Sequence, residues 1–233
     1  MPSIVWNRDP EEAYQNPYNY SAQEQFAREA RRLLDSLAVG YEKYQMTFHR
    51  DDRSLKKAVW MLQMDALDSL SHCLDMIELM RHRIAGRLFR DVVETLDLAA
   101  YFSSDSDKSR ANLEKWFDDK IILHRVYRDY IQKTIGAGAA KERAEFYSQL
   151  SKFSHRSYRA LQKGYSRGAG DMMVYEGYHE TMNVLPHTIA AYYSILAGLI
   201  LEFCNEAVKW GILSKVTVRK ARLTSFETKA ATH

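Results

Sequence analysis

Apolar residues recur at the helical spacing of three and four positions along almost the whole of this 233-residue chain. In the first such segment Leu33, Leu37 and Tyr41 fall on one stripe, and a second stripe follows Ser54, a residue type favoured as an N-cap. Only four prolines and ten glycines occur, too few for the turns of a many-stranded β fold. The sequence therefore predicts an all-α protein, an antiparallel bundle of about six long helices that needs no strands.

Breaks in the pattern and turn residues indicate where these helices end. The stripe after Ser54 continues to Tyr101 and is expected to break near Arg81–Gly86, because a single helix of that length would be unusual. The glycine-rich stretch Gly164–Gly170 is expected to be a flexible connection. The helical segments predicted in this way are 26–41, 55–101 with its break, 107–135, 141–162 and 185–203.

No internal repeat and no Pro/Ser-rich linker divides the chain, so a single folded domain is expected. We expect residues 1–20 to form an N-terminal arm and residues 21–212 to form the helical bundle. Residues 213–233 are rich in Thr, Lys and Arg and are predicted to be a basic, flexible tail.

The composition and charge exclude several classes of protein. The chain has 33 basic and 30 acidic residues. The resulting net charge of +3 permits nucleic acid as a partner without indicating it. Cys73 and Cys204 both fall in apolar helical patterns, which excludes a disulfide framework and favours a reducing compartment. The apolar run Thr188–Leu201 is shorter than the roughly 20 residues of a membrane span, and the polar N-terminus has no signal-peptide pattern. We expect a cytoplasmic protein with no membrane partner.

One polar face interrupts the apolar pattern of the helix predicted around residues 83–101. Six residues share a face about 80° wide: Arg83, Arg87, Arg90, Glu94, Asp97 and Tyr101. Arg90 and Glu94 are four residues apart, so their side chains can meet. Such a face is either a candidate functional site or the solvated side of a surface helix, which would contribute little to stability.

A second polar cluster lies on the helix predicted over 141–162. Ser151 and His155 are four residues apart on the flank of its apolar stripe, beside Tyr147 and Tyr158. We expect His155 to be partly buried, where a neighbouring carboxylate can shift its pKa across neutrality. It would suit a general acid or base or a group that binds an anion; the alternative is a structural histidine hydrogen-bonded to Ser151 and a backbone carbonyl.

Two sequence runs together resemble a bacterial helical family of unknown function. Its first signature, an Arg-x-x-x-Glu pair within an apolar run, is similar to the stretch Gly86–Leu96 with Arg90 and Glu94. Its second signature, Tyr-x-x-Leu-Ser-x-aromatic-x-His, is similar to the stretch Tyr147–His155. The two runs occur in the same order and at a similar separation, and the resemblance covers about Leu55–Arg159.

That family is related to the HEPN bundles, and the resemblance implies a small antiparallel bundle that forms a homodimer and acts in bacterial defence or abortive infection. Many HEPN proteins are ribonucleases that need no metal and use an Arg, a polar residue and a His, with four to six residues between the Arg and the His. None of the eight histidines here has an Arg five to seven positions before it. The resemblance instead implies a composite catalytic site of Arg90, Glu94 and His155. Around it we expect four binding residues: Arg87, Tyr147, Ser151 and Arg159.

Two functional hypotheses follow from these observations. In the first, the protein binds RNA or cleaves it without a metal ion. In the second, it is a non-catalytic interaction or scaffold module for a protein partner, and Arg90, Glu94 and His155 form a structural polar network. The pair Glu176-x-x-His179 has the spacing of a di-iron ligand pair, but the sequence contains no second copy. A site made of His72, His124 and His179 has no support from spacing, so we predict no metal and no cofactor.

Overall fold

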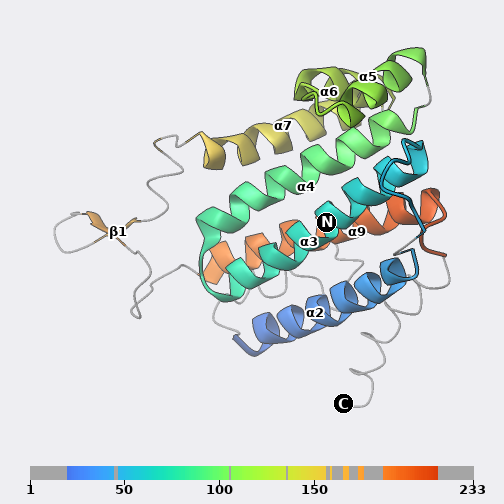
Figure 1. Ribbon diagram of the computed structural model, residues 1–233. Helices are drawn as coiled ribbons and strands as arrows, with labels where there is room; N and C mark the ends of the chain where they lie inside the picture. The colour runs from blue at the N-terminus through green and yellow to red at the C-terminus, as the bar shows by residue number, and fades with distance from the viewer. Residues whose placement is uncertain are drawn as a thin grey trace.

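The chain folds into a body of α-helices, seen in the computed structural model (Figure 1). The structure describes residues 20–44, 47–104, 106–134, 136–155, 158, 165–167, 173–175 and 186–214. The helices within these ranges are α2 (Tyr20–Glu42), α3 (Leu55–Glu78), α4 (His82–Phe102), α5 (Asp107–Phe117), α6 (His124–Thr134), α7 (Ala137–Ser154) and α9 (Pro186–Lys209). Two short strands, β1 (Tyr165–Arg167) and β2 (Met173–Tyr175), pair antiparallel. The predicted all-α class is confirmed.

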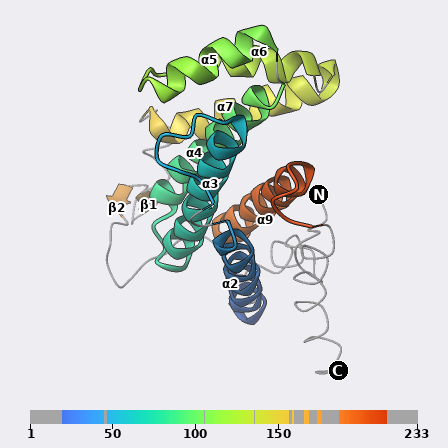
Figure 2. The same cartoon turned by 45° about the vertical axis from the view of Figure 1, so that its right-hand side comes forward.

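Helices α2, α3, α4 and α9 enclose the main hydrophobic core (Figures 1 and 2). Each helix contributes large side chains that are fully buried, among them Leu34 from α2, Leu70 from α3, Phe89 from α4 and Phe203 from α9. Burial of one such side chain stabilises the fold by about 1.5–3 kcal/mol. The periodic stripes read from the sequence are therefore the faces that form this core.

Helices α5, α6 and α7 form a second layer against the side of α4 that faces away from α2 (Figure 1). A small second core lies there, built from Phe102, Leu113 and Tyr127 together with Ala58 at the start of α3. Helix α4 thus has neighbours on two sides. Its apolar side faces the main core, and its polar side faces α6 and α7.

Three helices end in the same way, with one residue in the left-handed region. After α3, Met80 has φ 58°, and the Arg81 N–H bonds back to the Met76 carbonyl at 2.7 Å. After α5, Asp119 has φ 60°, and after α9, Gly211 has φ 66°. This backbone arrangement satisfies carbonyls that a helix end otherwise leaves unpaired. The predicted break near Arg81–Gly86 is confirmed and lies slightly earlier, between α3 and α4.

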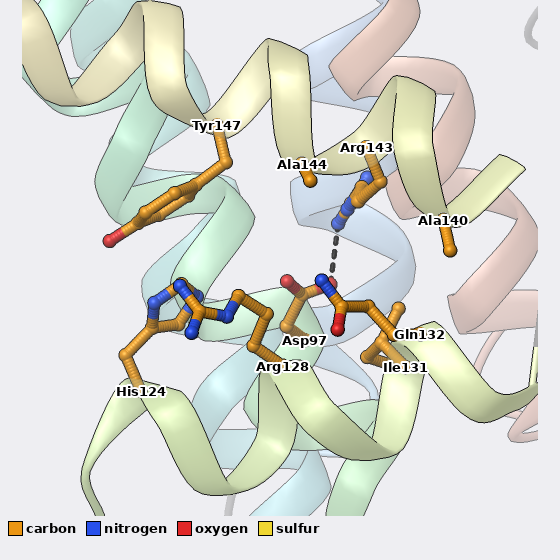
Figure 3. A pocket seen from close by; sticks show the side chains of 9 residues that line it. All are labelled: Asp97, His124, Arg128, Ile131, Gln132, Ala140, Arg143, Ala144 and Tyr147. Carbon is orange, nitrogen blue, oxygen red and sulfur yellow. Dashed lines mark hydrogen bonds and ion pairs between the residues drawn. The ribbon is translucent and has the colours of Figure 1, made fainter. Parts of the chain in front are cut away.

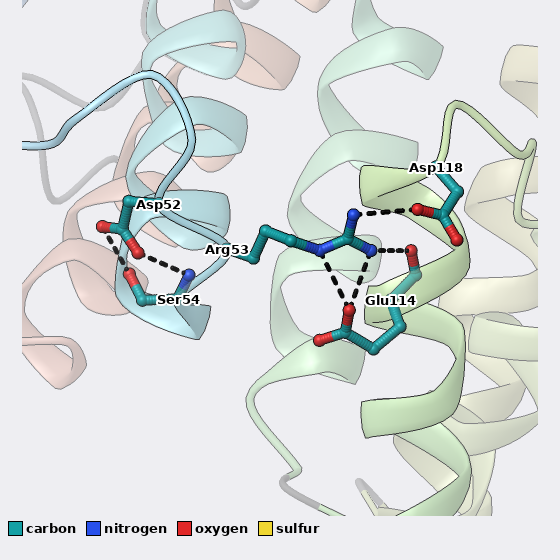
Figure 4. Close-up of polar contacts among 5 residues, drawn as sticks. All are labelled: Asp52, Arg53, Ser54, Glu114 and Asp118. Atoms are coloured by element: carbon teal, nitrogen blue, oxygen red, sulfur yellow. Dashed lines mark hydrogen bonds and ion pairs between the residues drawn. The ribbon is translucent and has the colours of Figure 1, made fainter.

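The start of α3 is fixed by a cap and by an ion-pair cluster (Figure 4). The Ser54 hydroxyl accepts the Lys57 N–H at 3.2 Å, so the predicted N-cap is confirmed. The adjacent Arg53 donates to Glu114 through Nε at 3.0 Å and to Asp118 through Nη1 at 2.8 Å. Both carboxylates belong to the end of α5, so Arg53 connects the start of α3 to the second layer.

Two predicted helices differ from the observed ones. The segment expected as one helix over 107–135 is two helices, because the left-handed Asp119 ends α5 and α6 starts only at His124. The helix predicted over 141–162 begins earlier, at Ala137, and α7 ends at Ser154. Tyr158 is again helical, and the other residues of the predicted segment beyond His155 lie outside the described residues. The helical pattern also does not indicate β1 and β2, whose tyrosines and Val174 are residue types common in strands.

The C-terminal end of the described chain packs into the core. Leu213, in the segment predicted as a tail, is buried, and Gly40 of α2 lies so close that a Cβ there would come within 2.6 Å of the Leu213 side chain. In the part of the chain that the structure describes, no helix combines the length and the apolar character needed to cross a membrane. The predicted N-terminal arm over residues 1–19, the tail from residue 215 and the Glu176/His179 pair lie outside the described residues.

Candidate functional site

The centre of the candidate site is an ion pair on the polar side of α4. Arg90 donates from Nε to Oε1 of Glu94 at 2.7 Å, across one helical turn. The two side chains are 21% and 26% exposed, so the pair sits at the edge of the α4–α7 contact rather than deep in the core. The i,i+4 pairing expected from the sequence is confirmed.

Tyr147 of α7 completes this network from the facing helix. Its hydroxyl donates to the same Glu94 oxygen, Oε1, at 2.5 Å. Its ring lies 5.3 Å from the Arg90 guanidinium carbon, within the range of a cation–π contact. Arg90 is therefore oriented by two neighbours, a carboxylate that accepts its hydrogen bond and an aromatic face beside it.

His155 lies at the end of α7 and reaches back to α4. Its Nε2 is 3.4 Å from Nη1 of Arg90, although 65 residues separate the two in the chain. The expectation of a partly buried His155 is wrong. Because α7 ends at Ser154, His155 is its C-cap residue and its side chain is exposed.

The electrostatics of this network favour a charged Glu94. Burial raises the pKa of the Glu94 carboxyl, but the hydrogen bonds from Tyr147 and Arg90 outweigh burial and leave the pKa below its ordinary value. Burial and the adjacent carboxylate raise the pKa of Tyr147, so its phenol stays protonated and can donate. Ser151, one turn along α7, lies close enough to the phenol to counter part of that increase.

A histidine from a third helix joins the site. His124, the first residue of α6, stacks on the Tyr147 ring with the ring centroids 4.2 Å apart. Figure 3 shows the His124 ring facing Tyr147, with the Arg128 side chain extended alongside it. Burial lowers the pKa of His124, and the positive charges of Arg128, Arg90 and Arg143 add to this effect while Glu94 opposes it.

These side chains border a small pocket between α4, α6 and α7 (Figure 3). Arg143 of α7 forms its inner wall and pairs with two carboxylates. It donates to Oδ1 of Asp97 on α4 at 2.6 Å and to Oε2 of Glu202 on α9 at 2.7 Å. Burial raises the pKa of Asp97 to about 6 against the opposing pull of Arg143. The Arg143 bridge therefore connects α7 to both α4 and α9.

The structure brings four of the predicted site residues into contact: Arg90, Glu94, Tyr147 and His155. Ser151 lies beside them through Tyr147. Arg87 is on α4 one turn before Arg90, and its buried Nε has no hydrogen-bond partner within the described residues. Arg159 lies outside the described residues.

The sequence interpretation misses two contributors, His124 and Arg143. His124 carries no spacing signal toward the other site residues, because it belongs to a short helix that was expected to be part of a longer one. Arg143 could be found only by pairing it with Asp97, which is 46 residues away. For both residues the decisive information is the packing of α6 and α7 on α4.

Metal ligands do not gather at this site. Among the described residues, no three His, Cys, Asp or Glu side chains come together in a group suited to a metal ion. His72 instead lies beside Asp68 on the exposed side of α3, with 3.5 Å between Nδ1 and Oδ2. Comparisons of the chain with protein-family models, with curated proteins and with solved structures give no match.

Chemically, the site combines a cation, a carboxylate, a phenol and two imidazoles. Arg90 can bind an anion or stabilise negative charge that develops in a transition state. His124 and His155 are residue types that exchange protons near neutral pH. This set of groups can therefore bind an anion and exchange protons beside it.

Proposed function

We propose that the protein is a HEPN-like helical bundle that binds RNA and cleaves it without a metal ion. The observation that carries the proposal is the meeting of Arg90 on α4 with His155 from the end of α7, 3.4 Å apart at the exposed edge of the contact between the two helices. An RNA backbone reaching this edge would meet a cation and an imidazole together. Mild positive net charge is compatible with such a partner.

In the proposed reaction the 2′-hydroxyl of the RNA attacks the adjacent phosphorus. An O2′–P bond forms, the P–O5′ bond breaks, and the products carry a 2′,3′-cyclic phosphate and a 5′-hydroxyl. His155 exchanges one of the two protons that move in this reaction. Arg90 stabilises the additional negative charge on the phosphoryl oxygens of the transition state.

The remaining residues have positioning roles in this proposal. Glu94 accepts from Arg90 and Tyr147 through one oxygen, which fixes the guanidinium where it meets His155. A displaced Arg90 would lose its alignment with the phosphate, and misplacement by about 1 Å can reduce a rate by roughly 100-fold. Tyr147 and Ser151 support Glu94 from α7.

A non-catalytic scaffold is the second candidate function. It is favoured by the sequence, which lacks the Arg–His spacing of HEPN ribonucleases, and by the participation of Arg90, Glu94 and Tyr147 in contacts that also hold α7 on α4. In this case the network would stabilise the surface that binds a protein partner. Under both candidate functions we propose the homodimer that the family resemblance implies. Light scattering of the purified protein tests this oligomeric state.

The test is cleavage of end-labelled RNA by the purified protein in the presence of EDTA. His155→Ala is compared with wild type, and His72→Ala is the matched control, because His72 is an exposed histidine on α3 outside the network. We expect wild type and His72→Ala to cleave and His155→Ala to lose about 100-fold or more of the rate. Absence of cleavage by the folded wild-type protein would favour the scaffold function instead.

A further inference from the structure

We infer that His124 is the second proton-transferring group of this site, acting as the base while His155 acts as the acid. The inference rests on the proposed RNA cleavage and deepens it, since one histidine cannot take a proton and give another in the same concerted step. The geometry that carries it is the position of the two imidazoles on either side of the Tyr147–Glu94–Arg90 network. Three helices, α4, α6 and α7, thus contribute to one reaction centre.

The two histidines are connected to each other through the same three side chains. His124 stacks on the Tyr147 ring at 4.2 Å and an interplanar angle of 29°. Tyr147 donates to Glu94, which also accepts from Arg90, and Arg90 contacts His155. These contacts therefore connect an imidazole on α6 to an imidazole at the end of α7 through Arg90, the group proposed to hold the phosphate.

The surroundings of His124 suit a base. A base must be neutral before it takes a proton. Half-burial disfavours the imidazolium of His124, and Arg90, Arg128 and Arg143 all face it from α4, α6 and α7. Glu94 is the carboxylate whose charge raises the pKa of His124, and it is already hydrogen-bonded to Arg90 and Tyr147.

The surroundings of His155 suit the opposite role. It is exposed at the C-terminal end of α7, where the partial negative charge of the helix dipole attracts a cation, while the Arg90 guanidinium 3.4 Å from its Nε2 opposes a second positive charge. An imidazolium there can deliver its proton to the leaving 5′-oxygen. The two histidines therefore differ in their exposure, since His124 is half-buried between α4 and α7 and His155 is exposed at the end of α7.

A purely structural role does not account for an imidazole at position 124. Stacking on Tyr147 needs only an aromatic ring, which a phenylalanine would supply. His124 instead has a buried Nε2 with no hydrogen-bond partner within the described residues, an arrangement that opposes stability. An imidazole therefore brings to this position a polar atom that the packing alone does not use.

In the proposed step His124 takes the proton of the 2′-hydroxyl as the O2′–P bond forms. The P–O5′ bond breaks, its electron pair goes to the 5′-oxygen, and His155 supplies the proton that this oxygen needs. Exchange with water then returns one proton to His155 and removes one from His124. No oxidant, reductant or co-reactant is required.

The test compares two RNA substrates at pH 5 to 9 in EDTA, one ordinary and one with sulfur in place of the bridging 5′-oxygen. A thiolate leaves without protonation, so the sulfur substrate bypasses the acid and not the base. The variants are His124→Phe, which keeps the stacking on Tyr147, His124→Gln, which keeps a polar group, and His155→Gln. Near-ultraviolet circular dichroism selects the position-124 variant that keeps the wild-type fold.

We expect the cleavage rates of both position-124 variants to fall by about 100-fold or more on both substrates. The increase of the rate with pH should also disappear. His155→Gln should recover most of its rate on the sulfur substrate. Wild-type rates and pH profile in a folded position-124 variant would overturn the role of His124 and leave the ribonuclease proposal intact. Recovery of the cleavage rate of His124→Phe on the sulfur substrate would overturn the assignment of His124 as the base. A folded wild type that cleaves neither substrate would overturn both proposals.

Discussion

Tyr147 on α7 donates its hydroxyl hydrogen bond to Glu94 on α4, to the same oxygen that accepts from Arg90. This contact and the Arg143–Asp97 ion pair join the second layer of helices to the polar side of α4. The two contributing residues are 53 positions apart in the chain. The charged network on α4 is therefore completed only when α7 is docked.

Replacing Tyr147 by Phe removes this donor and keeps the ring. Because Glu94 is left with one fewer hydrogen bond, we expect the free energy of unfolding to fall by about 1–2 kcal/mol and the pKa of Glu94 to rise. RNA cleavage should fall by about 10-fold or more, since Arg90 loses part of its alignment. Urea unfolding and a single-turnover cleavage assay measure the two effects; wild-type values of both would contradict a role for this hydrogen bond.

The Arg143 bridge predicts a large loss of stability when it is broken. Arg143→Met leaves Asp97 buried without its cation, and we expect a loss of about 3–5 kcal/mol in the free energy of unfolding. The double variant Arg143→Met/Asp97→Leu should recover much of that loss, because the more deeply buried of the two carboxylates is removed and only the 31% exposed Glu202 is left without its cation. Chemical denaturation of both proteins tests this, and equal stability of the single and double variants would argue against the pairing.

Asp97 predicts a dependence of stability on pH. Its pKa is raised by burial to about 6 in the folded protein, above an ordinary value of 3.8. The folded chain therefore holds a proton that the unfolded chain releases, so the contribution of Asp97 to stability declines as pH rises from about 4 to about 6. In Asp97→Asn this decline should be absent. Urea unfolding of both proteins at pH 4 and pH 7 makes the comparison, and parallel pH profiles would refute the prediction.

Loss of the N-cap of α3 should lower the stability of the protein without affecting the candidate site. Ser54→Ala removes the acceptor of the Lys57 N–H, and we expect a loss of about 1 kcal/mol. The rate of RNA cleavage should remain that of wild type under conditions where both proteins are folded. Ser54→Asp, which keeps an acceptor, should retain most of the stability; a loss as large as that of the alanine variant would show that the cap is not the cause.

Much of the main bundle is predictable from the sequence because its helices bury one regular stripe each. Leu34, Leu70 and Phe203 lie on such stripes and are buried. The break within 107–135 is harder to predict, because the residue in the left-handed conformation is Asp119, whereas α9 ends at a glycine, Gly211. A charged residue in a polar stretch gives little indication of a helix end.

The candidate site is predictable only along single helices. Arg90 and Glu94 are found because they are four residues apart, and His155 because it belongs to a second signature run. The contacts of Tyr147 with Glu94 and with His124 cross between helices, and spacing within a helix carries no information about them. The burial of His155 was predicted wrongly because it depends on the residue at which α7 ends.

The position of Glu202 has a consequence for the order in which the protein matures during synthesis. Glu202 is the later of the two carboxylates that hold Arg143, and it lies 59 residues after it. A chain growing on the ribosome therefore exposes Arg90, His124, Tyr147 and His155 before α7 has its second anchor. The hold of α7 on the bundle therefore depends on α9, the latest helix in the part of the chain that the structure describes, and is completed only when α9 packs.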